Sequence, residues 1–76
     1  MQERIVIDAE ILRGKPIIGG TRISVELVLD LLASGMTVEE VIDDYPSLTR
    51  EDILSALKYA AKIVKHDELH SLAETA

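Results

Sequence analysis

The sequence predicts a mainly α fold: a three-helix, helix-turn-helix-like core with a short N-terminal β-hairpin. Two β-prone runs stand near the N-terminus, and a glycine pair follows them. Three apolar segments with helical spacing come next, each beginning after a Ser or Thr that suits a helix N-cap. The 76 residues are enough for one domain, which we place at residues 1–64, and residues 65–76 form a C-terminal tail.

The predicted hairpin consists of Arg4–Asp8 and Pro16–Ile18, joined through a loop that contains Gly14. Two strands alone are marginal in water, so the hairpin should lie on the helices or pair with a second copy. We expect Gly19 and Gly20 to supply positive φ angles for the reversal into the first helix.

The first helix is predicted over residues 25–34, with Ser24 as its N-cap and Gly35 as its C-terminal stop. Its polar residues form one narrow stripe and the rest of its surface is apolar. A helix that apolar needs partners on most sides, which favours a homodimer formed by this helix and the hairpin.

The second helix opens with the capping box Thr37-Val38-Glu39-Glu40 and ends at Pro46. Thr49 is the predicted N-cap of the third helix, with Asp52 at the reciprocal position, and this helix should run to about Val64. The tail keeps a weak helical period, and we expect it to fray unless a partner covers it. The expected core face of the third helix is Ile53, Ala56, Leu57, Ala60, Ile63 and Val64.

The net charge is -6, and the acidic residues concentrate in the middle of the chain, where residues 24–57 carry eight acidic side chains and one Arg. An acidic protein is a poor generic nucleic-acid binder and suits a basic protein partner better. The sequence has no Cys and no apolar run of membrane-spanning length, so we expect a cytoplasmic protein without a membrane partner.

Two spacings could suggest ligand chemistry. Gly14 and Gly19 have the spacing of a phosphate loop, but Gly20-Thr21 stands where that loop needs Lys followed by Ser or Thr, so turn geometry explains these glycines better. His66 and His70 could grip a divalent metal ion from one helical face, but no third ligand is apparent. We therefore predict no enzymatic activity, no cofactor and no functional metal site.

The second and third helices with their short turn resemble a helix-turn-helix, whose second helix enters the DNA major groove. Glu51, Asp52 and the acidic second helix would repel phosphates, so the alternative is a plain three-helix core with a solvated lysine face. If DNA is bound, the predicted contacts on the third helix are Arg50, Ser55, Lys58, Tyr59 and Lys62, and those on the hairpin side are Arg13, Lys15 and Arg22.

Four carboxylates follow one another closely on the second helix: Glu39, Glu40, Asp43 and Asp44. The simplest interpretation is a solvated face, and the alternative is a docking surface for a basic protein. Leu69 and Leu72 in the tail are further candidates for partner contact, since a loose segment can fold onto a partner.

The combined pattern resembles the bacterial and archaeal family catalogued as domain of unknown function 433. The resemblance implies a fold related to helix-turn-helix domains and the role of an antitoxin, whose partner would be a small PIN-like nuclease toxin. It carries over no catalytic residues. Two alternatives remain: a stand-alone dimeric DNA-binding regulator, and an assembly module without nucleic-acid contact. The matching residues are Gly14-Lys15-Pro16, Ile18, Gly20-Thr21-Arg22-Ile23, Gly35, Thr37, Glu39-Glu40, Tyr45-Pro46, Leu48-Thr49, Glu51-Asp52-Ile53, Ala56-Leu57 and Tyr59-Ala60.

Overall fold

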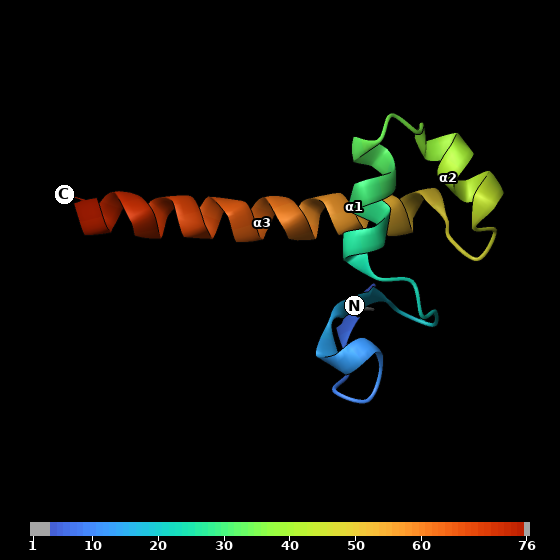
Figure 1. The fold of residues 1–76 in the computed structure, drawn as a ribbon, viewed down its shortest axis with the longest axis horizontal. Helices are drawn as coiled ribbons and strands as arrows, with labels where there is room; N and C mark the ends of the chain where they lie inside the picture. Colours follow the sequence, from blue (N-terminus) through green and yellow to red (C-terminus); the bar gives the residue numbers. More distant parts are fainter. Residues whose placement is uncertain (1–3, 76) are drawn as a thin grey trace.

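The computed structural model describes residues 4–75, and it describes the side chains of residues 4–66. The fold is mainly helical, with three helices and a two-stranded antiparallel hairpin, as predicted (Figure 1). The elements are β1 (Ile5–Ile7), a 3-10 turn (Leu12–Gly14), β2 (Pro16–Ile18), α1 (Val25–Ala33), α2 (Val38–Asp44) and α3 (Arg50–Thr75).

The hairpin is stabilised by pairing between its two strands and by contacts with the helices. Ile5 pairs with Ile18 across the two strands, and Ile17 forms a further bridge with Ser24 at the start of α1. Ile17 and Ile18 are buried, so β2 contributes directly to the core. This packing explains how a two-stranded sheet persists in a chain of this size.

The glycine turn before α1 follows the prediction at one of its two positions. Gly20 has a φ of 79°, in the left-handed region that favours glycine. The prediction for Gly19 was wrong, because the positive φ angles among the described residues do not include it. Thr21 completes the turn, with its Oγ1 donating to the Ile18 carbonyl and accepting from the backbone N–H of Ile23.

All three predicted N-caps are confirmed by hydrogen bonds. The Oγ of Ser24 accepts from the backbone N–H of Leu27 at 2.9 Å. Thr37 and Glu40 form the reciprocal capping box of α2. Thr49 Oγ1 accepts from the backbone N–H of Asp52 at 3.1 Å, while the Asp52 carboxylate accepts from that of Thr49 at 3.0 Å. Each helix therefore starts where its local sequence predicts.

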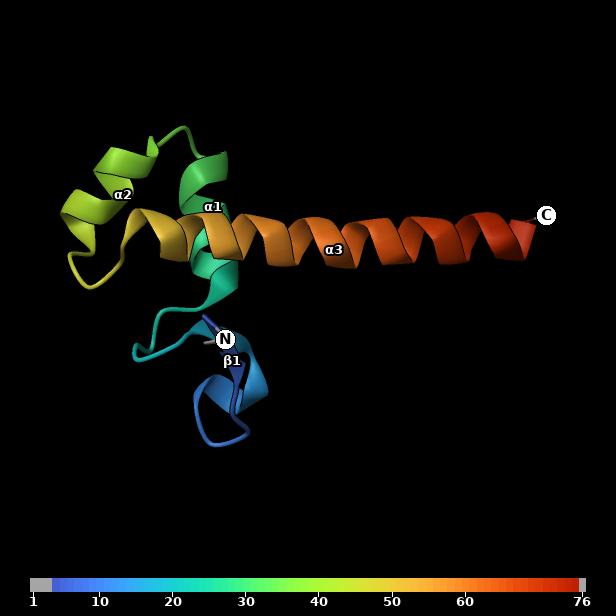
Figure 2. The same cartoon turned by 180° about the vertical axis from the view of Figure 1, so that it is seen from behind.

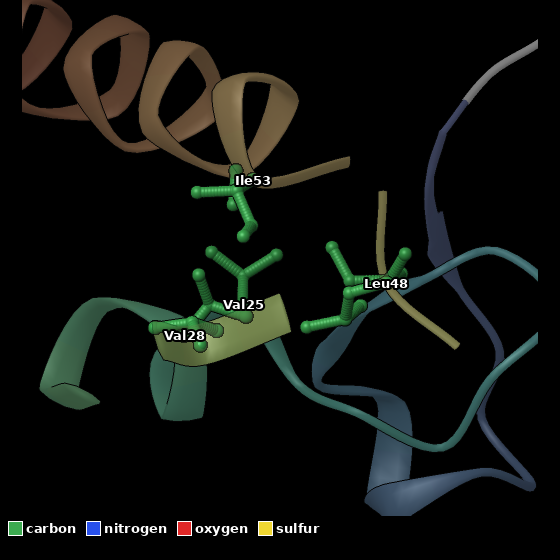
Figure 3. Close-up of a cluster of buried hydrophobic side chains, with 7 residues drawn as sticks. Val25, Val28, Leu48 and Ile53 are labelled. Carbon is green, nitrogen blue, oxygen red and sulfur yellow. The ribbon is translucent and has the colours of Figure 1, made fainter. Parts of the chain in front are cut away.

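The core lies where α1, α2 and the first turns of α3 meet β2. Figure 3 shows Val25 and Val28 of α1 close to Ile53 of α3, with Leu48 of the α2–α3 turn beside them. Within residues 4–66, the buried apolar residues are Ile17, Ile18, Val25, Val28, Val41, Leu48, Ile53 and Ala56.

Asp52 connects the hairpin with the helical core. Its side chain is only 11% exposed, and its Oδ1 accepts a hydrogen bond from Arg4 Nη1 at 3.0 Å, across 48 positions of sequence. Because the other carboxylate oxygen caps α3, one side chain fixes both the start of α3 and the approach of the N-terminal strand.

The third helix is longer than predicted: it continues past Val64 to Thr75. Figures 1 and 2 show its C-terminal half projecting past α1 as a single rod. The predicted core face is confirmed at Ile53 and Ala56, and it was wrong for Leu57, Ile63 and Val64, which are exposed. For Ile63 and Val64 the reason is geometric, since α1 crosses α3 near its N-terminal half and covers only the first part of the apolar stripe. None of the described helices combines the length and apolarity that a membrane crossing requires.

Candidate interaction surfaces

The first candidate is the acidic surface of α2, made of Glu39, Glu40, Asp43 and Asp44, all of which are exposed. Two of the four carboxylates have partners within the fold. The Glu40 carboxylate accepts from the backbone N–H of Thr37 at 2.9 Å, which completes the capping box. Among the described side chains, neither Asp43 nor Asp44 makes a hydrogen bond or an ion pair. These two charges are therefore available to an external partner.

Glu39 pairs with Arg50, which joins α2 to the first turn of α3. The pKa of Glu39 lies below its ordinary value, mainly because the Glu39 backbone N–H donates to the carboxylate and also because Arg50 donates a hydrogen bond and contributes a positive charge. The predicted DNA contact Arg50 is thus already engaged. Arg50 could reach a guanine only after leaving Glu39.

The second candidate is the lysine stripe of α3, made of Lys58, Lys62 and Lys65, all exposed. Helical spacing puts these residues on the side of α3 opposite the buried Ile53 and Ala56. Among the other predicted DNA contacts on α3, Ser55 is half-buried and borders this stripe, whereas Tyr59 packs against the core. The structure therefore groups the lysines together and separates them from Tyr59.

The basic residues of the hairpin side occupy three different settings. Lys15 forms an exposed ion pair with Glu26 of α1 at 3.0 Å. Arg13 lies at the hairpin tip with a φ of 57°, next to Leu12 with a φ of 51°. Two consecutive residues other than glycine in the left-handed region store strain on the order of 1 kcal/mol each. Arg22 is exposed in the loop before α1.

The third candidate was missed by the sequence analysis. It is a groove between α1 and α3 with a volume of about 320 Å³ and an almost wholly apolar lining. We call it the α1–α3 groove. The signal that could have found it is the run of apolar residues on the third helix beyond the length that α1 can cover. The residues that line the groove are Pro16, Val25, Glu26, Leu29, Asp30, Tyr59, Ala60, Ile63 and Val64.

The remaining predicted residues lie at or beyond the end of the described side chains. His66 is exposed, and no group of three or more metal-ligating side chains gathers within the described part of the chain. His70, Leu69 and Leu72 lie outside the described side chains. The metal interpretation and the tail contacts therefore stay predictions.

Comparison with known proteins decides the family. Residues 5–60 match the family model described as "Protein of unknown function (DUF433)". The chain belongs to the DUF433 family. A crystal structure of a DUF433 member protein from Anabaena variabilis ATCC 29413 resembles it, with a TM-score of 0.79 and 28% sequence identity over 91% of this chain and 68% of that chain. No curated protein matches the sequence. The DUF433 match covers the hairpin, α1, α2 and the start of α3, and ends where the projecting part of α3 begins.

Proposed function

We propose that this DUF433 chain acts by binding another protein, as the antitoxin of a toxin–antitoxin pair whose toxin is a small PIN-like nuclease. In this proposal the chain is not an enzyme and works in the cytoplasm. The antitoxin role itself comes from the family resemblance given above. Two described surfaces support protein binding. The acidic surface of α2 supplies charge, and the α1–α3 groove supplies apolar contact area.

The observation that carries the proposal is the acidic surface of α2. Asp43 and Asp44 stand on an exposed helix that is fixed to the core by its capping box and by the Glu39–Arg50 pair. A rigidly held, unpaired negative patch attracts a basic partner and accelerates its encounter with the chain. Nucleic-acid-binding nucleases present basic surfaces to their substrates, so the acidic surface suits such a partner.

The test is affinity capture from a nuclease-treated lysate of the source organism, with mass spectrometry of the retained proteins. Wild-type chain should retain one small nuclease in near-equal amount. Asp43→Asn/Asp44→Asn should lose most of it, because the partner's basic surface would no longer be attracted. Glu10→Gln/Glu51→Gln is the matched control, since it removes two exposed carboxylates elsewhere and should retain the nuclease. Recovery of the wild-type chain alone would reject the proposal.

A second candidate function, a dimeric DNA-binding regulator, is favoured by the lysine stripe. Three exposed lysines on one side of a helix that follows a short turn could hold a phosphate backbone. Duplex binding measured at two salt concentrations tests it: Lys58→Glu/Lys62→Glu should abolish a strongly salt-dependent affinity. If the wild-type chain binds neither DNA nor nuclease, the assembly module without nucleic-acid contact is the remaining alternative.

A further inference from the structure

The outer edge of β1 is a strand edge that the fold leaves open. β1 and β2 are the two strands of the sheet, so each has one outer edge. The outer edge of β2 is occupied by the chain itself, because the Ile18 N–H donates to the Ile23 carbonyl at 2.9 Å. Within residues 4–75, no strand pairs with the outer edge of β1.

The register of the hairpin shows which backbone groups this edge presents. The Gly19 N–H donates to the Arg4 carbonyl at 2.7 Å, so these two residues form a hydrogen-bonded pair. Such pairs alternate with non-hydrogen-bonded pairs along an antiparallel ladder, and Ile5 and Ile18 form a pair of the second kind. The N–H and C=O groups of Ile5 therefore point outward, as do those of Ile7. Within residues 4–66, no hydrogen bond satisfies these outward groups.

The side chains of β1 do not protect this edge. Native proteins discourage further pairing at an edge strand with Pro, Lys or a bulge. Ile5, Val6 and Ile7 are instead all β-branched and aliphatic, and such residues favour strand pairing. Val6 is 37% exposed and Ile7 is 62% exposed. The edge thus combines unpaired backbone groups with apolar side chains, which is the kind of surface that accepts an additional strand.

The β1 strand is complementary to a second copy of itself. Antiparallel pairing about Val6 sets Ile5 opposite Ile7 of the second copy, and both residues point their backbone groups outward. Each Ile5–Ile7 pair would then exchange two hydrogen bonds. The same register sets Arg4 opposite Asp8 of the second copy, so opposite charges face each other at both ends of the paired strands.

Both charged side chains retain groups for this contact. Arg4 donates to Asp52 through Nη1, and its side chain is 47% exposed. Its remaining guanidinium N–H groups make no hydrogen bond within residues 4–66. Asp8 accepts from the Glu10 backbone N–H through Oδ1 at 2.9 Å, which leaves Oδ2 for an external donor. The fold therefore holds a cation and an anion at the two ends of β1, and each has bonding capacity to spare.

We propose that the outer edge of β1 is a homodimer interface, in which β1 of a second copy pairs antiparallel about Val6 and completes a four-stranded sheet. The two Val6 residues would form a non-hydrogen-bonded pair on the two-fold axis, with their Cα atoms about 4.5 Å apart. The interface predicted from the sequence used the hairpin and α1, whereas α1 takes no part in this one. The proposal does not depend on the antitoxin function, because the acidic surface of α2 lies on the side of the fold away from the hairpin (Figures 1 and 2).

The first test is disulfide cross-linking through one introduced thiol. The chain has no Cys, so oxidation can link only two copies. Val6→Cys should give a covalent dimer with wild-type helicity, because the Cα separation at the axis lies in the range that a disulfide spans. Ile7→Cys tests the register: Ile7 is more exposed than Val6, but the two copies of this position would lie about 8 Å apart, too far for a disulfide.

Leu12→Cys controls for random collision, since Leu12 is 39% exposed, close to Val6 at 37%, and lies at the hairpin tip. Both Ile7→Cys and Leu12→Cys should stay largely monomeric under conditions that cross-link Val6→Cys. Equal cross-linking of the three variants, or none at Val6→Cys, would overturn the proposal.

The second test is the solution mass of the chain over a series of concentrations, measured by sedimentation equilibrium. Wild type should reach twice the 8.4 kDa chain mass. Ile7→Lys should stay at one chain mass with an unchanged circular dichroism spectrum, because the new charge would face Ile5 of the second copy but is exposed in the single chain. Leu12→Lys is the matched control and should associate like wild type. An Ile7→Lys dimer would overturn the proposal, and so would a monomeric wild type, which would leave the edge to an extended strand of another protein.

Discussion

Replacing Asp52 with Ala tests whether one carboxylate holds the hairpin and the start of α3 together. In the folded chain Oδ1 accepts from Arg4 Nη1 and Oδ2 accepts from the backbone N–H of Thr49, both at 3.0 Å. Loss of the N-terminal cap contact costs about 1 kcal/mol. The pair with Arg4 adds no more than about 1 kcal/mol, because the Arg4 side chain is 47% exposed and solvent screens it.

The expected loss is therefore about 1–2 kcal/mol, a substantial part of the roughly 4–11 kcal/mol that a 76-residue domain has in total. At 4–8 °C per kcal/mol, the Tm of Asp52→Ala should fall by about 4–16 °C. Urea unfolding followed by circular dichroism measures the free energy of unfolding directly. Arg4→Ala should lower the free energy of unfolding by less than half as much as Asp52→Ala does. A double-mutant cycle of the two substitutions gives the interaction energy of the Arg4–Asp52 pair.

Asp43→Ala is the matched control, since Asp43 is exposed on α2 and makes no polar contact with the described side chains. Its effect should stay within about 0.5 kcal/mol. If Asp52→Ala destabilises the chain no more than Asp43→Ala does, the reasoning that assigns Asp52 a joining role is refuted.

Three further perturbations test the local account of the helices. Thr37→Ala removes one half of the capping box of α2 and should cost about 1 kcal/mol in urea unfolding; no loss would contradict the capping account. Gly35 has a φ of 104° at the end of α1, so Gly35→Ala should lower the Tm through strain of about 1–3 kcal/mol, whereas an unchanged Tm would count against that conformation. The folded-state pKa of Glu39 is depressed by its own backbone N–H and by Arg50, so its contribution is present above the ordinary pKa of 4.5 and is lost as the pH falls below it. The Tm of Glu39→Gln should consequently fall less between pH 6 and pH 3 than that of wild type; identical pH profiles would exclude this linkage.

The start of every helix could be predicted from the sequence because an N-cap depends on a few adjacent residues. Ser24, Thr37 and Thr49 each accept a hydrogen bond from a backbone N–H three positions ahead, and that geometry follows from the local chain alone. The hairpin was predictable for a related reason, since the β-prone runs and the intervening Gly14 are close in sequence.

The features that escaped prediction depend on how far one helix overlaps another. The apolar residues Ile63 and Val64 continue the core period of α3, and the sequence does not show that α1 crosses α3 near its N-terminal half and leaves them uncovered. The ion pair between Arg50 and Glu39 could not be predicted for the same reason, because it joins residues on two helices across a turn. The Glu39–Arg50 pair reduces the support for Arg50 as a DNA contact. The exposure of Ile63 and Val64 reveals an apolar groove.

Inhibition of the captured nuclease tests most directly the proposal that this chain neutralises a nuclease through the acidic surface of α2. Nucleic-acid cleavage by that nuclease should fall to background when the chain is added in equal molar amount. Asp43→Asn/Asp44→Asn should need a large excess, whereas Glu10→Gln/Glu51→Gln should inhibit like wild type. Full cleavage in the presence of excess wild-type chain would contradict the proposal.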